Sequence, residues 1–112
     1  MKIIIIGGVA GGATAAARLR RLDERAEIVL VERGPYISFA NCGLPYHISG
    51  AIAERGKLLV TSEAMFEARY HVDGRSRTEA LSIDRIARTV TMRNLESGED
   101  TAVYRFLPNL AR

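Results

Sequence analysis

Residues 3–12 read IIIIGGVAGG, and this stretch decides the expected fold. Its four isoleucines form a continuous β-branched run, which is typical of a short central strand buried on both faces of a parallel sheet. The run stops at Gly7, and the composition then changes to Ala, Leu and Arg, which predicts a helix over about residues 11–23. A second apolar run at residues 28–31 completes a β-α-β unit. The sequence therefore predicts an α/β fold that begins with a Rossmann-like unit.

A small antiparallel β-meander is expected after this unit. Residues 63–70 have helical spacing and follow Ser62 or Thr61, either of which can cap a short helix. Three β-like stretches come next, at residues 77–83, 89–93 and 101–106. The last two flank a hairpin turn at residues 96–99, ESGE. A chain of this length has room for one domain at most.

The composition is that of an ordinary globular domain, with 47% apolar and 26% charged residues and a net charge of +3 over 112 residues. The basic residues are too scattered for a nucleic-acid surface. Lys2 and the apolar run after it imitate a signal peptide, but glycines interrupt that run.

Cys42 is the single cysteine, which excludes an internal disulfide and favours a reducing compartment. His47 and His71 lack partners at metal-ligand spacing. We expect a cytoplasmic protein without a metal site and without a membrane or nucleic-acid partner.

The glycine turn has the spacing of a dinucleotide-binding fingerprint. Gly7 and Gly12 occupy the first and last positions of the pattern G-x-G-x-x-G, between a strand and a helix. Gly7 permits the tight turn and Gly12 a close approach of helix and sheet, while the helix N-terminus offers N–H groups to a pyrophosphate. Val9 stands at the middle glycine position, where its side chain could crowd the diphosphate. Glu32 follows Gly12 by 20 residues, at the end of the second strand, where its carboxylate can accept hydrogen bonds from ribose hydroxyls.

These residues leave two interpretations of the turn open. A dinucleotide such as FAD or NAD is the favoured ligand, and the fingerprint does not separate the two. The alternative is that the glycines only make a tight strand-to-helix turn and that Glu32 is a solvated charge at a strand end.

The single cysteine belongs to a second motif besides the glycine turn, the segment SFANCGLPY at residues 38–46. Taken alone, a lone cysteine is more often a buried, inert thiol than a reactive one. The glycine turn, Glu32 and this segment together resemble the N-terminal part of coenzyme A disulfide reductases, within the pyridine nucleotide-disulfide oxidoreductase family. The resemblance covers about residues 1–104. Its cysteine segment is specific for the single-cysteine branch of the family, which also includes NADH oxidases and peroxidases.

The resemblance implies a redox role for Cys42. Two-cysteine members of the family carry a C-x4-C pair, but His47 and Ile37 stand at the two positions where a partner of Cys42 would be. A one-thiol site holds its oxidised state as a mixed disulfide or as a sulfenic acid. By resemblance, Cys42 is the catalytic nucleophile beside a flavin. FAD is then the cofactor, NAD(P)H the hydride donor, and coenzyme A or another small thiol the partner in the mixed disulfide.

The resemblance also assigns binding residues. It implies FAD contacts by Gly7, Val9, Ala10, Gly11, Gly12, Glu32, Arg33 and Asn41. It implies coenzyme A contacts by Thr14, Arg18, Arg21, Ser38 and Asn41. Arg18 and Arg21 lie three residues apart on the predicted helix and could face phosphates together, although a solvated helix arginine is the commoner role for either.

Part of the family's pattern does not occur in this sequence. Family members are several times longer and add an inserted NAD(P)H domain and a C-terminal dimerisation domain. We therefore expect an incomplete FAD domain at residues 1–104 and a divergent tail at residues 105–112, without NADH turnover by the chain alone. Gly74 and Ser76 replace apolar residues expected in the third strand, and they should weaken its packing. An open sheet edge could support a homodimer or another association.

Two rival functions are kept beside the disulfide reductase fragment. The first is a non-catalytic dinucleotide-binding module that retains Gly7, Gly12 and Glu32, and a flavin-bound preparation without NADH oxidation would favour it. The second is a fragment of a single-cysteine NADH oxidase or peroxidase, in which Cys42 is oxidised to a sulfenic acid.

Overall fold

The computed structural model describes residues 2–39, 44–54 and 59–105. Helices and strands alternate through its first part, and strands alone make up the last part. The elements are β1 (Lys2–Ile6), α1 (Gly11–Leu22), β2 (Glu27–Val31), β3 (Ser38–Phe39), α2 (Leu44–Ile48), β4 (Leu59–Thr61), α3 (Glu63–Tyr70), β5 (Val72–Arg75), β6 (Thr78–Asp84), β7 (Thr89–Asn94) and β8 (Asp100–Arg105). None of the described helices is long and apolar enough to cross a membrane.

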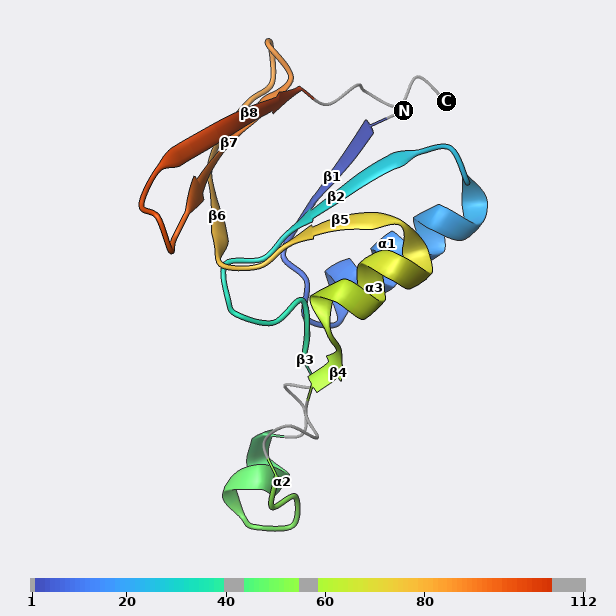
Figure 1. The fold of residues 1–112 in the computed structure, drawn as a ribbon, viewed down its shortest axis with the longest axis vertical. Coiled ribbons are helices and arrows are strands. Elements are labelled where there is room, and N and C mark those ends of the chain that lie inside the picture. Colours follow the sequence, from blue (N-terminus) through green and yellow to red (C-terminus); the bar gives the residue numbers. More distant parts are fainter. Residues whose placement is uncertain (1, 40–43, 55–58, 106–112) are drawn as a thin grey trace.

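The predicted β-α-β unit is confirmed as the frame of the molecule. β1 and β2 pair in parallel from Lys2↔Glu27 to Ile6↔Val31, and α1 connects them. β5 pairs in parallel with the other side of β2, so the sheet has the order β1-β2-β5 (Figure 1). Parallel strands end at the same edge of a sheet, and this edge therefore brings the turns after β1, β2 and β5 together. The glycine turn and Glu32 both lie there.

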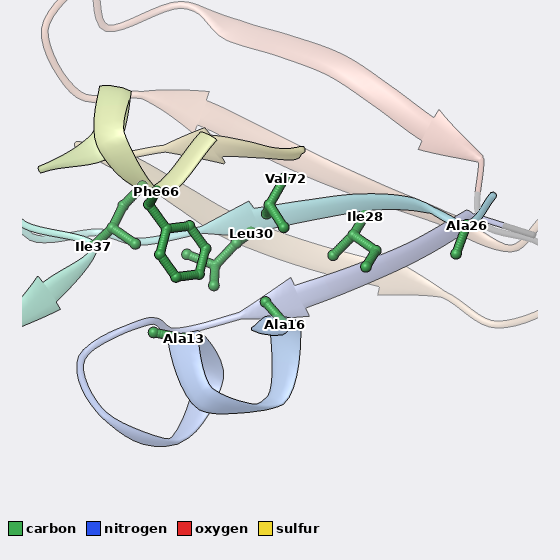
Figure 2. Close-up of a cluster of buried hydrophobic side chains, with 8 residues drawn as sticks. All are labelled: Ala13, Ala16, Ala26, Ile28, Leu30, Ile37, Phe66 and Val72. Carbon is green, nitrogen blue, oxygen red and sulfur yellow. The ribbon is translucent and has the colours of Figure 1, made fainter. Parts of the chain in front are cut away.

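Both faces of the central strand β2 are covered, as its uninterrupted apolar run predicts. The same prediction is wrong for β1, which is an edge strand whose isoleucines are only partly buried, with Ile6 50% exposed. Side chains of β2 alternate between two cores: Ile28 and Leu30 pack toward the helices, whereas Val29 and Val31 pack toward β7. Figure 2 shows the core on the helix side, which comprises Ala13, Ala16, Ala26, Ile28, Leu30, Ile37, Phe66 and Val72. β2 is therefore the central strand of three layers, with helices on one face and the meander on the other.

Helices α1 and α3 lie on the same face of the sheet (Figure 1). α1 presents Ala13 and Ala16 to the strands, and such short side chains let the helix approach them closely. α3 begins at one of the two predicted caps, because Ser62 Oγ accepts a hydrogen bond from the Met65 N–H at 3.2 Å. Phe66 of α3 is buried in the same core as the two alanines. The two helices thus meet through a shared apolar core.

β6, β7 and β8 form the predicted antiparallel meander, and the ends of each strand lie within one residue of their expected positions. The hairpin turn between β7 and β8 is also where the sequence predicts it: the Gly98 N–H donates to Asn94 O at 2.8 Å and the Asn94 N–H to Glu99 O at 3.0 Å. Arg105, the first residue of the expected divergent tail, is the last residue of β8. The rest of that tail lies outside the described residues.

A short excursion separates β2 from α3. β3 and β4 form a two-stranded antiparallel pair, and α2 lies beyond them, at the end of the molecule remote from the meander (Figure 1). His47 in α2 is bonded locally, with Nδ1 2.7 Å from Ile52 O. Asn41 and Cys42 lie outside the described residues.

The sequence predicts that Gly74 weakens the packing of the third strand, and this prediction is wrong, because a buried side chain occupies the space over the glycine. A Cβ added at Gly74 of β5 would meet Cδ1 of Ile37, whose side chain is 1% exposed. The absent side chain of Gly74 therefore makes room for Ile37 and leaves no packing defect. Ser76 follows the strand, and its Oγ donates to Glu63 Oε2 at 2.5 Å, which ties the end of β5 to the start of α3.

Candidate functional site

The glycine turn has the backbone geometry that its spacing predicts. Gly7 leaves β1 with φ of +93°, a left-handed conformation, and its N–H donates to Val31 O at 2.7 Å. A Cβ at Gly12 would meet the carbonyl oxygen of Gly7 and Cγ2 of Ile5. A glycine at position 12 therefore lets the first turn of α1 rest against the end of β1. Val9 adopts φ of +52°, which is unfavourable for a β-branched residue.

Glu32 joins this turn to the loop after β2. Its Oε1 accepts a hydrogen bond from the Gly8 N–H at 3.0 Å, and its Oε2 accepts one from the Gly34 N–H at 2.6 Å. Its backbone is held as well, because its N–H donates to Arg75 O and its carbonyl accepts from the Thr78 N–H. A carboxylate oxygen accepts more than one hydrogen bond, so both oxygens keep capacity for a further donor. Glu32 is a fixed acceptor rather than a freely solvated charge.

A cavity of about 220 Å³ opens beside Glu32. The residues that line it come from the ends of β1 and β2 and from β6, and they are Ile6, Gly7, Val31, Glu32, Arg33, Thr78, Glu79 and Ala80. Gly7, Glu32 and Arg33 are among the cofactor-binding residues expected from the sequence. Arg33 is on the rim, with its side chain 75% exposed and its guanidinium 3.8 Å from the Glu79 carboxylate. The contribution of β6 is not expected from the sequence, since only the tertiary fold brings this strand to the cavity.

The N-terminus of α1 is open to an anion. Ala10 is the N-cap and makes no side-chain capping hydrogen bond, and the first turn contains no acidic residue. The Gly12 N–H donates to Gly8 O at 3.0 Å, and the remaining N–H groups of a first helical turn, together with the helix dipole, favour a phosphate at such a position. The expected cofactor residues at 9–12 form this turn, whereas Asn41 lies outside the described residues. An open helix end, a close-packed glycine and a fixed carboxylate acceptor fit the adenosine diphosphate part of a dinucleotide.

A second concavity, of about 560 Å³, lies between α1 and α3. We call it the helix groove, and its lining residues are Ala13, Thr14, Ala17, Arg18 and Arg21 of α1, Ser38 of β3, and Met65, Phe66, Arg69 and Tyr70 of α3. The fold thus brings together Thr14, Arg18, Arg21 and Ser38, four of the five residues that the resemblance assigns to coenzyme A. Asn41 is the fifth, and it lies outside the described residues.

The helix groove is cationic and has an apolar floor. Arg18, Arg21 and Arg69 line it, and none of its lining residues is acidic. In the part of the chain that the structure describes, the guanidinium groups of Arg18 and Arg21 have no hydrogen-bond or ion-pair partner. The Arg69 guanidinium lies 5.4 Å from the centre of the Tyr70 ring, and that ring is 5.0 Å from the Phe66 ring. Such a surface fits a ligand that combines phosphate groups with an apolar chain.

Sequence reasoning misses the wall of the groove that α3 contributes, namely Met65, Phe66, Arg69 and Tyr70. Their spacing is a signal that they share one side of a helix, because residues three and four positions apart are neighbours on a helix surface. The spacing does not say which element that side meets. The proximity of α3 and α1 depends on the return of the chain after β4, which no local pattern encodes.

Comparisons with known proteins give concordant matches. The family described as Pyridine nucleotide-disulphide oxidoreductase matches residues 1–106. A coenzyme A disulfide reductase from Staphylococcus epidermidis is 40% identical over 98 residues, which are 88% of this chain and 22% of that protein.

Two solved structures are similar over most of the described fold. The reduced CoADR-RHD of Bacillus anthracis is 51% identical, with a TM-score of 0.86, over 92% of this chain and 18% of that one. The NAD-dependent persulfide reductase of A. fulgidus is 39% identical, with a TM-score of 0.82, over 90% of this chain and 19% of that one. The chain spans about a fifth of the length of these relatives.

Proposed function

The chain belongs to the pyridine nucleotide-disulphide oxidoreductase family, and on this basis we propose that it supplies the FAD-binding and coenzyme A-binding part of an NAD(P)H-linked disulfide reductase. Cys42 is the redox residue of this proposal, and coenzyme A disulfide is the substrate. The chain spans about a fifth of the length of these relatives, and the role proposed for its residues is that of a half-site.

One observation carries the proposal: Thr14, Arg18, Arg21 and Ser38 converge on one cationic groove. Coenzyme A bears a diphosphate and a further phosphate, and arginine guanidinium groups are suited to bind phosphate through paired hydrogen bonds. Arg69 adds a third guanidinium to the groove. The apolar floor is suited to the uncharged remainder of the molecule, and Asn41 is assigned to both coenzyme A and FAD.

Thiol–disulfide exchange is the chemistry proposed for Cys42. Its thiolate attacks one sulfur of coenzyme A disulfide, the S–S bond breaks, and one coenzyme A leaves as a thiolate. Cys42 then holds the other coenzyme A in a mixed disulfide. Two electrons supplied by NAD(P)H, together with a proton, cleave that bond, restore the Cys42 thiolate and release the second coenzyme A. A single cysteine suits this cycle, because a mixed disulfide needs no second protein thiol.

The residues at the glycine turn are proposed to hold FAD. Glu32 accepts hydrogen bonds from ribose hydroxyls, the turn at residues 9–11 presents its N–H groups to the diphosphate, while the Gly12 N–H donates to Gly8 O at 3.0 Å, and Gly7 and Arg33 line the adjoining cavity. When bound, FAD supplies a two-electron carrier between a nicotinamide donor and a disulfide.

Two measurements on the purified chain test the proposal. The chain is mixed with FAD and desalted before its absorbance spectrum is recorded, and its intact mass is measured under non-reducing conditions after exposure to coenzyme A disulfide. We expect retained flavin absorbance and an added mass of one coenzyme A. Cys42→Ser is the control, and it should keep the flavin and lose the adduct. A wild-type chain that retains no flavin and acquires no adduct would contradict the proposal.

The groove is tested separately by calorimetric titration with coenzyme A. Arg18→Gln and Arg21→Gln should each weaken binding by about tenfold or more, because a hydrogen bond to a charged group contributes roughly 1.5–3 kcal/mol. Arg85→Gln is the matched control, since this exposed arginine of the β6–β7 turn carries the same charge outside the groove. Equal losses in all three variants would mean that net charge, and not the groove, binds the ligand.

A persulfide is the second candidate substrate, and the 39% identity to a persulfide reductase favours it. Attack of the Cys42 thiolate on the outer sulfur of a persulfide would break its S–S bond, transfer that sulfur to Cys42 and release the remainder as a thiolate. Mass spectrometry separates the candidates: one added sulfur atom on Cys42 indicates a persulfide, and one added coenzyme A indicates a disulfide. A sulfenic acid would instead favour the oxidase or peroxidase alternative. Retained flavin without any cysteine product would favour the non-catalytic module.

Two further properties belong to the proposal. The single cysteine favours a reducing compartment such as the cytoplasm. Copies of the chain, or another chain, are expected to associate through β1, which is one of the two edge strands of the described parallel sheet, with β5 at the other edge.

A further inference from the structure

Arg20 joins the C-terminal ends of the two groove helices. Its Nε donates to Tyr70 O and its Nη2 to His71 O, both at 2.8 Å, at the end of α3. Its Nη1 donates to Asp23 O at 3.3 Å and to Glu24 O at 2.8 Å, just after α1. One guanidinium therefore binds four backbone carbonyls from the ends of both helices.

These carbonyls form a site that suits an arginine better than a lysine. The last carbonyls of a helix have no partner within it, and the helix dipole adds partial negative charge there. A guanidinium offers five N–H donors in a rigid plane, whereas an ammonium offers three from a single point. A lysine at position 20 would keep the charge without reaching the same set of carbonyls.

The carbonyls that Arg20 binds adjoin the cationic end of the helix groove. Tyr70 and Arg69 line the groove on α3, and Arg21, the next residue after Arg20, lines it on α1. Arg20 is not among the residues that line the groove. We infer that Arg20 is a positioning residue, which fixes the spacing between the cationic ends of α1 and α3 and thereby sets the affinity of the groove for a phosphate-bearing thiol. This inference rests on the proposed function of the helix groove.

The test compares coenzyme A affinities of the full chain and its variants by calorimetry at low temperature, after circular dichroism has shown each chain to be folded. Arg20→Met and Arg20→Lys should both bind about tenfold more weakly, because small displacements of binding groups cost affinity steeply. Arg25→Met is the matched control, since it removes an exposed charge just after α1 and should leave the affinity unchanged. If Arg20→Met does not fold, Arg20→Lys alone decides the question.

FAD affinity, measured on the same chains, separates positioning from general loss of stability. The glycine turn lies at the opposite end of α1, about 14 Å from Arg20 along the helix axis. FAD binding should therefore be unchanged in both Arg20 variants. Wild-type coenzyme A affinity in Arg20→Lys, or equal losses of both ligands, would overturn the inference. A wild-type chain that binds no coenzyme A would overturn the proposed function and this inference with it.

Discussion

Glu32 links two loops through a single carboxylate. Each of its oxygens already accepts a backbone N–H, one from Gly8 in the glycine turn and one from Gly34 after β2. This arrangement fixes the acceptor before any ligand arrives, so little entropy is lost when a ribose binds. The same carboxylate therefore contributes to the fold and to the proposed cofactor site, and the two contributions can be measured separately.

Glu32→Ala should lower the free energy of unfolding by about 1–3 kcal/mol in the absence of FAD, because two backbone N–H groups lose their acceptor. Glu32→Gln keeps one acceptor oxygen and should lose less. Urea denaturation measures this effect, and FAD titration of the folded variants should show affinity weakened by on the order of 1–3 kcal/mol for Glu32→Ala. Unchanged stability would contradict the two amide contacts, and unchanged FAD affinity would contradict the ribose contact.

Gly11 and Gly12 are adjacent but should respond differently to alanine. A Cβ at Gly12 meets the Gly7 carbonyl, which is backbone and cannot rotate away, whereas a Cβ at Gly11 meets nothing within 4 Å. Gly12→Ala should destabilise the fold by roughly 1–3 kcal/mol through overpacking. Gly11→Ala should be neutral, or stabilise the helix by up to about 1 kcal/mol. Thermal unfolding of the two variants checks this, and a smaller loss for Gly12→Ala than for Gly11→Ala would contradict the close packing of α1 on β1.

At the scale of elements, β5 and the segment before β3 depend on each other. Ile37 fills the space over Gly74, and its carbonyl lies where a side chain at Gly8 would be. One residue therefore packs against both β5 and the glycine turn. The residue after it, Ser38, is 6% exposed and lines the helix groove, so the same packing positions part of the groove wall.

Gly74→Ala should destabilise the chain by about 1–3 kcal/mol, because its Cβ overlaps with the buried end of Ile37. Ile37→Val removes that end and should itself cost about 0.5–1.5 kcal/mol. The double variant should be more stable than the sum of the two losses predicts, since the shortened side chain makes room for the new methyl group. Chemical denaturation of the four chains gives the coupling, and strict additivity would contradict the direct contact.

The β7–β8 hairpin should show a small dependence on pH. Arg93 Nε donates to Asp100 Oδ1 at 2.7 Å, and this hydrogen bond holds the pKa of the Asp100 carboxyl below its ordinary value. A lowered pKa in the folded state stabilises the chain above the ordinary pKa of the carboxyl, and that stabilisation is lost as the pH falls through the lowered value. Asp100→Asn should therefore flatten the acid side of the stability profile. An identical profile in the variant would show that the exposed pair contributes nothing measurable.

At the scale of the whole molecule, the three layers leave β1 at the border of the described sheet. β1 reads KIIII, so its only charge is at the first residue, and Ile6 at its end is 50% exposed. Protected edge strands usually carry charges, proline or bulges that oppose pairing with another chain. β1 has a single charge and no proline, and that composition favours association.

We expect the sedimentation coefficient of the chain to rise with concentration, because exposed strand edges pair with one another. Sedimentation velocity over a hundredfold range of concentration measures this, at high and low salt to separate strand pairing from charge effects. A constant monomer value across the range would contradict the proposed association through β1.

The amino-acid sequence by itself determined the β-α-β unit, the roles of Gly7 and Gly12, a helix cap at Thr61 or Ser62 and the β7–β8 turn. Each of these follows from a local pattern, because backbone sterics, helix capping and hydrophobic period act over a few neighbouring residues. The family resemblance added the residues of α1 and β3 that the helix groove brings together.

Only the tertiary structure decided which surfaces meet. It brought α3 to the helix groove and the side chain of Ile37 over Gly74. It placed the Glu32 carboxylate on the N–H of Gly8, 24 positions earlier in the chain. It also placed the guanidinium of Arg20 on the carbonyl of His71, 51 positions along the chain. Contacts of this kind depend on how whole elements pack against a shared core, and no periodicity within either segment specifies the partner.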